Sequence, residues 1–433
     1  MVGPPRGVLD TMHPTPIQLV ALALFVAALL HTFLARRFEQ LSQRFPRHAG
    51  LFHLLGEVEV VFGFWAMVLV LAMAAILDVD RALDYAESRN YTEPLFVFVV
   101  MVVAASRPVL LTVTRVVDAL ARAMPLPTPI ASAWLGLAAV PLLGSLITEP
   151  AAMTIAALML APKIFRPDIR EAPKYLALGV LFVNVSIGGT LTAYAAPPVL
   201  MVAQTWQWDS AFMLVHFGWK AAIAVLVNAS VATFMLRKHL LRASAAPDDV
   251  AGDVRARIPG LVMTVHLVLL AGIVAFSHHP AVFLALFMMF LGYTQAYERY
   301  QSPLILKEAL LVGFFLAGLV VLGGLQRWWL QPIVSSLQPT ALFFGALGLT
   351  AITDNAALTY LGSLIAGMSS ESKYMLVAGA VAGGGLTVIA NAPNPAGLAL
   401  LKRGFADQSI GAGELLLGAL GPTAVAAAAF LLL

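Results

Sequence analysis

Long apolar runs follow one another along this chain and constrain its fold more than any other feature. They cover residues 16–35, 51–77, 94–114, 128–165, 173–204, 209–236, 259–276, 280–297, 306–325, 339–366, 373–401 and 411–433. About 20 apolar residues suffice for a helix to cross a bilayer. Only 11% of the residues are charged and 60% are hydrophobic, whereas soluble domains are about 25% charged. We therefore expect an all-α polytopic membrane protein, and we exclude a soluble enzyme, a disordered chain and a nucleic-acid binder.

Several classes of chemistry find no support in the sequence. The chain has no cysteine, so disulfides, thiolate metal sites and cysteine nucleophiles are excluded. It has no phosphate-binding loop, no HExxH motif and no GxSxG motif. Residues 1–15 do not resemble a removable signal peptide. We expect no cofactor and no enzymatic activity.

Two polar, helix-breaking motifs recur in the same order in the two halves of the chain. Residues 147–154 (ITEPAAMT) align with residues 352–359 (ITDNAALT) at an offset of 205, and residues 188–192 (GGTLT) align with residues 383–387 (GGGLT) at an offset of 195. Chance similarity of apolar segments explains matches of Ala and Leu, but it does not explain two recurring polar motifs. Interrupted segments at matching places in two halves indicate a transporter binding site.

The charge distribution predicts how the two halves are oriented. We expect a first repeat over residues 1–240, a linker over 241–257 and a second repeat over 258–433. If the first broken run of each half is a re-entrant hairpin, each half crosses five times and the repeats are inverted. The loops that then share one side hold 19 of the 26 Lys and Arg residues. By the positive-inside rule this side is cytoplasmic, so the linker is cytoplasmic and both termini face out.

Glu149 and Asp354 are the acidic residues that matter most in this scheme. They occupy equivalent places in the two repeats, at breaks in apolar runs. An ionisable side chain at membrane depth costs about 2.5–3.5 kcal/mol on insertion scales, so it normally lines a cavity or an ion path. Thr148, Thr353 and Asn355 flank the pair, and hard cations prefer such oxygen ligands. We expect these residues to bind the cation and carry the proton; the alternative is that the acids only cap helices or pair with a base.

The glycine breaks are expected to form the opposing wall of this site, because glycine lets the chain unwind and approach closely. The predicted wall consists of Gly188, Gly189, Thr190, Thr192, Gly384, Gly385, Thr387 and Asn391. Glycines in membrane helices also serve ordinary helix packing, and this alternative stays open.

Three further charged residues are accessory candidates. Glu57 and Glu59 are two apart, so on one helix they point about 200° apart and cannot share a site. One of them could serve a proton path, or both could form ion pairs or lie at the level of the headgroups. Lys220 lies within an apolar run, where a membrane carboxylate is its natural partner, unless it snorkels to the interface.

Two motifs carry a resemblance to the ion transporter (ArsB/NhaD) superfamily. The first is Asn184-x-Ser186-Ile187-Gly188-Gly189-Thr190-x-Thr192, followed by Pro197-Pro198 and Met201. The second, Asn391-Ala392-Pro393-Asn394-Pro395 with the tip over residues 353–359, resembles a bacterial family described as putative sodium/proton antiporters. The resemblance implies two inverted repeats of five transmembrane helices, each with a re-entrant helical hairpin and a discontinuous helix. It also implies a homodimer with a moving transport domain in the bacterial inner membrane.

The function implied is secondary transport, with Na⁺ and H⁺ competing for Glu149 and Asp354. The alternatives are sodium-coupled transport of a small anion, such as a carboxylate or the oxyanion arsenite, and a polytopic membrane enzyme. Anion binding normally needs an Arg or Lys at the site, and neither tip has one. Val199 stands where the superfamily usually has Asn, which removes one candidate ligand. The tips read Thr-Glu-Pro and Thr-Asp-Asn instead of Ser-Asn-Thr, which argues against the dicarboxylate branch.

Overall fold

The computed structural model describes residues 14–243 and 258–433, and every regular element in these two segments is a helix. Six of the described helices are long and apolar enough to cross a membrane, which confirms a polytopic membrane protein. These six are α1 (Pro16–Arg44), α3 (Val58–Ile76), α10 (Glu171–Gly188), α12 to α13 (Ser210–Met213 and Trp219–Ala243, continuous through the π-helical turn Leu214–Gly218), α16 (Leu306–Gly323) and α22 (Ala412–Leu432).

Two more pairs of helices form bent apolar segments. They are α5 (Thr92–Ala104) with α6 (Arg107–Ala123), bent by 65°, and α7 (Thr128–Leu137) with α8 (Ala139–Ile147), bent by 42°. The expectation of a plain helix over 94–114 is therefore wrong. Pro108 has no N–H, and its ring would clash with the carbonyl of Ala104, so α5 ends there. Pro141 ends α7 at Leu137 for the same reason.

The remaining helices are shorter. They are α2 (Ala49–Gly56), α4 (Val79–Glu87), α9 (Glu149–Leu160), α11 (Pro197–Trp206), α14 (Gly260–Ala275), α15 (Pro280–Ala296), α17 (Arg327–Ser335), α18 (Pro339–Thr350), α19 (Asn355–Ser363), α20 (Ser370–Gly383) and α21 (Asn394–Leu401). The expected ten crossings include α14, α15 and α20, which have 16, 17 and 14 residues, so that number stays a prediction. Because α13 reaches Ala243, the predicted linker begins inside a helix; its residues 244–257, and 1–13 of the N-terminal segment, lie outside the described residues.

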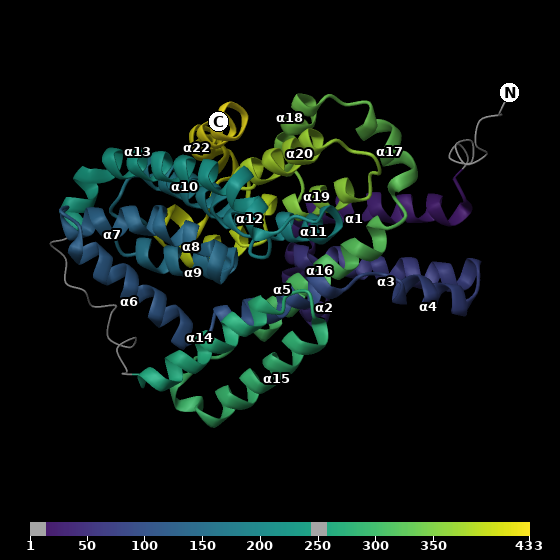
Figure 1. Ribbon diagram of the computed structural model, residues 1–433, viewed down its shortest axis with the longest axis horizontal. Coiled ribbons are helices and arrows are strands. Elements are labelled where there is room, and N and C mark those ends of the chain that lie inside the picture. The colour runs from purple at the N-terminus through teal and green to yellow at the C-terminus, as the bar shows by residue number, and fades with distance from the viewer. Residues whose placement is uncertain (1–13, 244–257) are drawn as a thin grey trace.

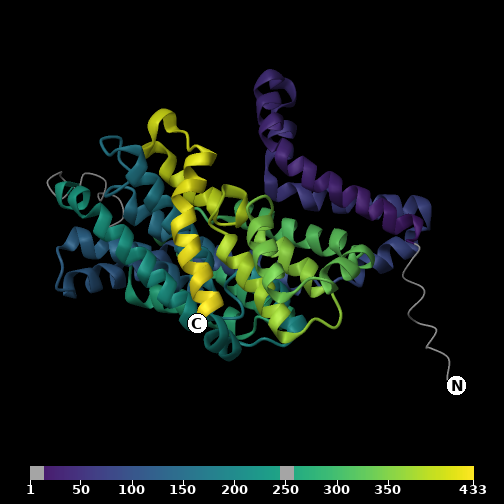
Figure 2. The same cartoon turned by 90° about the horizontal axis from the view of Figure 1, so that it is seen from above.

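The helices form several groups (Figure 1). In that view α7 to α10 and α13 lie on the left, α17 to α20 on the upper right and α14 with α15 at the bottom, while Figure 2 shows α1 and α2 forming an arm that projects from the rest. In the apolar stretch of α10, 83% of the residues are buried inside the protein, whereas only 22% are buried in the apolar stretch of α1. Helices α13 and α22 pack against α10, so α10 is a central span that faces protein, whereas α1 is peripheral.

Two pairs of glycines let central helices touch backbone to backbone. Gly179 of α10 lies against the backbone of Gly418 in α22, and Gly318 of α16 lies against the backbone of Gly63 in α3. Small residues of this kind allow membrane helices to approach closely, because lipid gives no hydrophobic drive for association. Ordinary packing is thus the role of these glycines.

Helix α4, within the segment expected to be the external loop 78–93, is tied to α16. The Tyr85 hydroxyl donates a 2.6 Å hydrogen bond to the carbonyl of Val321, in the last turn of α16. The last carbonyls of a helix have no partner within it, so Tyr85 satisfies one of them. Burial raises the pKa of Tyr85 to about 12, which keeps this donor protonated.

Candidate functional site

The first break falls at Thr148, between α8 and α9. Thr148 has φ 78° and ψ 152°, a region that β-branched residues rarely occupy. Such a conformation costs about 1–3 kcal/mol and persists only when the surroundings impose it. The sequence places the break over Thr148, Glu149 and Pro150, and in the structure α9 already begins at Glu149. The chain therefore breaks at Thr148, the first residue of the predicted interruption.

Glu149 is fully buried and half partnered. Its Oε2 accepts a 2.8 Å hydrogen bond from Nδ2 of Asn391, which belongs to the second half of the chain. Its Oε1 is buried without a hydrogen-bond partner. Gly189 lies against the same oxygen, since a Cβ on Gly189 would stand 2.5 Å from Oε1. One carboxylate oxygen therefore faces a glycine wall and remains available to a ligand.

The second break has a different geometry. Residues 351–354 separate α18 from α19, and the Asp354 Oδ1 caps α19 by accepting from the backbone N–H groups of Ala356 (2.8 Å) and Ala357 (3.2 Å). Asp is among the preferred N-cap residues. Asn355 is buried, and its Nδ2 lies 3.5 Å from the hydroxyl of Ser186 in α10. Asp354 thus caps α19 with one of its two oxygens, and its cation-binding role stays a prediction.

The predicted wall threonines bind backbone carbonyls. The Thr190 hydroxyl donates to Ile187, Thr192 donates to Ser145 and Thr387 donates to Ala351, at 2.6, 2.7 and 2.9 Å. Thr192 and Thr387 fix the unwound segments to the ends of α8 and α18, whereas Thr190 bonds within its own segment. Each hydroxyl donates its hydrogen to a carbonyl, and the role of these oxygens as cation ligands stays a prediction.

The predicted wall glycines permit close approach. A Cβ on Gly188 would stand 2.6 Å from the carbonyl oxygen of Pro141. Gly384 lies against the side chain of Ser186, and Gly385 lies against the backbone of Val183. The packing alternative therefore applies to these three glycines. Gly189 alone of the four meets a charged side chain.

Each break borders a small cavity with mostly apolar walls. Thr353 and Asp354 line a cavity with residues of α1, α3 and α16, namely Leu29, Thr32, Phe62 and Phe315. Thr148 and Pro150 line a second one with residues that include Val97, Met101, Tyr194 and Val312. The two breaks thus border separate small cavities.

The accessory candidates take other places. Glu57 lies between α2 and α3 instead of on a helix with Glu59, because its ψ of 117° is extended, and its Oε1 lies 3.4 Å from Nζ of Lys307. Glu59, in the first turn of α3, is near enough for its charge to act on Asp354. Lys220 donates a 2.9 Å hydrogen bond to the hydroxyl of Tyr374, so a phenol takes the place of the expected carboxylate.

Two hydroxyl residues near the breaks were not predicted. Ser145 donates to the carbonyl of Gly188 at 2.7 Å and accepts from the backbone N–H of Leu191 at 2.9 Å. Thr350 is buried with its Oγ1 unpartnered. Both stand three residues before the tip threonine, at the same offset of 205 that relates the tips. That recurrence in the two halves was the available signal.

The comparison with protein families shows where this chain belongs. Residues 16–433 match a family described as "Putative Na⁺/H⁺ antiporter", so the chain belongs to this family, as the motifs predicted. Among solved structures the chain is similar to the Alcanivorax borkumensis YdaH transporter, described as having an unusual topology. The two are 15% identical, the alignment covers 87% of this chain and 97% of that chain, and the TM-score is 0.43. No curated protein matches.

Proposed function

We propose that this transporter exchanges Na⁺ for H⁺ at Glu149 and Asp354. One observation carries the proposal: around both breaks, buried side-chain oxygens lack hydrogen-bond partners. They are Oγ1 of Thr148, Oε1 of Glu149, Oδ1 of Asn391, Oγ1 of Thr350, Oδ1 of Asn355 and Oδ1 of Asn394. An unpaired buried acceptor costs about 1–3 kcal/mol. A desolvated cation with hard-oxygen preference offsets this cost, whereas an anion adds to it.

The contacts at the second break disfavour anion transport. An anion would use the free N–H groups at the start of a half-helix. At α19 the Asp354 carboxylate already accepts from two of them. Lys220, the nearest candidate for a counter-charge on α13, bonds to Tyr374 instead. Since none of these contacts supplies a cation to the site, a small anion would meet carboxylates without a compensating base.

Matched contacts in the two halves support our proposal of inverted repeats with re-entrant hairpins α8–α9 and α18–α19. Thr192 and Thr387 both donate to carbonyls at the end of the first hairpin helix. Gly188 and Gly383 both face a carbonyl oxygen of that helix, because a Cβ on either glycine would stand 2.6 Å from that oxygen. Helix α9 packs on α21, and α19 on α11, so each hairpin contacts the discontinuous helix of the other half.

The proposed exchange follows from sharing one set of oxygens. A proton on Glu149 or Asp354 neutralises the carboxylate and removes the charge that holds Na⁺. Release of the proton restores that charge, so one ion leaves before the other binds. We further propose that the protein is a homodimer in a bacterial inner membrane, with both termini outside and residues 1–240 and 258–433 as the repeats.

The test is cation-driven proton movement in everted vesicles, with Na⁺, Li⁺ and K⁺ supplied in turn. Glu149→Gln and Asp354→Asn should abolish exchange, since each removes a charge with little change in volume. Glu308→Gln is a matched control. Like Glu149 in α9, Glu308 lies in the first turn of its helix, α16, but its side chain is exposed, whereas that of Glu149 is buried. Exchange with none of the cations, or full activity of Glu149→Gln, would overturn the proposal.

A further inference from the structure

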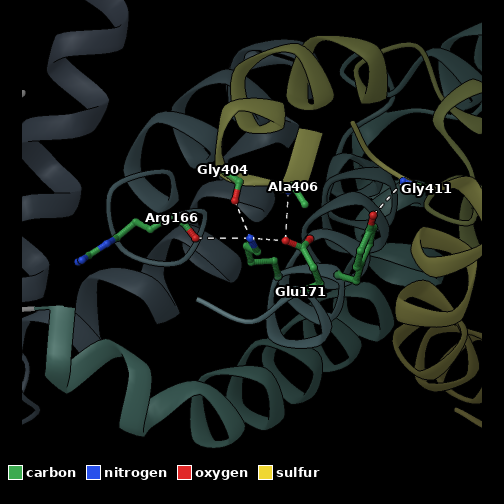
Figure 3. Close-up of polar contacts among 7 residues, drawn as sticks. Arg166, Glu171, Gly404, Ala406 and Gly411 are labelled. Carbon is green, nitrogen blue, oxygen red and sulfur yellow. Dashed lines mark hydrogen bonds and ion pairs between the residues drawn. The ribbon is translucent and has the colours of Figure 1, made fainter. Parts of the chain in front are cut away.

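Lys174, in the first turn of α10, is fully buried, although the proposed exchange does not use it. Its Nζ donates to Oε1 of Glu171 at 2.7 Å and to the carbonyl of Gly404 at 2.6 Å, and it lies 3.5 Å from the carbonyl of Arg166. Figure 3 labels Arg166, Gly404 and Glu171 around the point where the dashed lines of these contacts meet. We call this set the lysine clamp.

The clamp joins two connecting segments that are far apart in the sequence. Arg166 lies in the segment that follows α9, whereas Gly404 lies in the one that follows α21. Glu171 also accepts from the backbone N–H of Ala406 at 3.2 Å, and the Phe405 ring lies under the lysine ammonium at 5.2 Å. A buried charge persists only when its donors are satisfied, so these contacts hold the two segments in one arrangement.

The same two helices meet at their other ends in the candidate site. Helix α9 begins at Glu149, and Asn391 precedes α21 and donates to Glu149. Between the ends, Gly397 of α21 lies against the side chain of Met153 in α9. We propose that Lys174 is a positioning residue: by clamping the far ends of α9 and α21, it fixes the register that keeps Asn391 on Glu149. This inference rests on the proposed function.

The related pair of helices has a different contact at this place, where Lys373, in the first turn of α20, is only half-buried and lies over the ring of Trp206 at the end of α11, at 5.5 Å. Helix α11 packs on α19, as α21 packs on α9. At the offset of 195, the residue that corresponds to Lys174 is Ser369, which caps α20 through the backbone N–H of Ser372. The clamp therefore serves the half of the site that holds the fully buried Glu149.

Lys174→Met tests the positioning role. It keeps the length of the side chain and removes the charge and the donors, while Glu171, whose side chain is 42% exposed, remains solvated. We expect apparent Na⁺ affinity about tenfold or more weaker at an unchanged amount of folded protein, since small misplacements of a site carry such losses. Lys402→Met, an exposed position on the clamped segment, should leave the affinity unchanged. Wild-type Na⁺ affinity in Lys174→Met would overturn the proposal.

A tether gives a second, independent test. Because the chain has no cysteine, Arg170→Cys with Ala406→Cys, two exposed positions beside the clamp, can be joined by a bismaleimide without other reactions. We expect the tether to restore Na⁺ affinity in Lys174→Met. In the protein that keeps Lys174, we expect the tether to leave exchange intact. Loss of exchange on tethering would mean that the far ends of α9 and α21 must separate, which refutes the clamp.

The failure of the clamp and that of the proposed function are distinguishable. Spin labels on the same two cysteines, with Lys174 in place, report their separation without any transport assay. One narrow distance with and without Na⁺ supports the clamp even if no cation is exchanged. A broad or two-peaked distribution refutes it whatever the chain transports.

Discussion

Asn391→Leu should shift the pH dependence of exchange to alkaline values. Asn391 donates to Oε2 of Glu149 at 2.8 Å, and the other oxygen of that carboxylate has no partner. Leu keeps most of the volume and removes the donor. The charged carboxylate then loses a hydrogen bond that only the charged form uses fully, so the proton is released less readily.

The magnitude follows from the type of bond. A hydrogen bond to a charged group contributes about 1.5–3 kcal/mol. Each pH unit corresponds to about 1.4 kcal/mol. The pH of half-maximal exchange should therefore rise by about 1–2 units. Na⁺ binding at a fixed pH should weaken, because a larger fraction of the carboxylate is protonated at that pH.

The assay is Na⁺-driven proton release in proteoliposomes between pH 5 and 9, with Asn228→Leu as the matched control. The Nδ2 of Asn228, on α13, bonds to Oδ1 of Asn184 and to the carbonyl of Pro422, at 3.0 and 3.2 Å, and not to a carboxylate. Its loss should reduce the amount of stable protein without moving the pH profile. Equal shifts in both variants, or no shift in Asn391→Leu, would refute the assignment of Asn391 to Glu149.

Four further outcomes are expected. Gly189→Ala should abolish exchange, because its Cβ would stand 2.5 Å from the free glutamate oxygen, whereas Gly345→Ala, with open space around it, should not; equal activity of the two in vesicles would contradict this. Calorimetric Na⁺ affinity should weaken about tenfold per pH unit below the pKa of a single critical carboxylate, and a flat profile would exclude direct competition. Tyr85→Phe should lower the free energy of unfolding by about 0.5–1.5 kcal/mol. The loss should be equal from pH 5 to 9, because the pKa of Tyr85 is about 12 and the hydrogen bond weakens only as the pH rises through that value. A loss confined to acid pH would count against this assignment. A reporter after residue 245 should be cytoplasmic and one near residue 84 external, and either reversal would break the charge argument.

The sequence predicted the places of the breaks better than their geometry. A polar motif in an apolar run is visible in the letters, so Glu149 and Asp354 were found as a related pair. What each acid contacts depends on elements from the other half, such as Asn391 reaching Glu149, and no local pattern reports that contact. Lys220 shows the same limit, because its partner Tyr374 lies on α20, far along the chain.

The helix ends set by two prolines, by contrast, were predictable from the sequence. Pro108 and Pro141 each end a helix four residues earlier, and both bends were missed by treating apolar runs as plain helices. Helix α4, an amphipathic stretch in a charged segment, was also missed because the loop was interpreted by its charge alone.

The central burial of α10 has a consequence for biosynthesis. Its Asn184 accepts from Asn228, which in turn donates to the carbonyl of Pro422 in α22, and Gly179 needs Gly418 beside it. During synthesis α10 enters the bilayer long before α22 emerges from the ribosome. In that interval its polar side chains and its bare glycine face are exposed to lipid or to an insertion factor. Assembly of the core must therefore wait for the distal helix, and a nascent chain stalled before α22 has these polar groups and this glycine face without their partners.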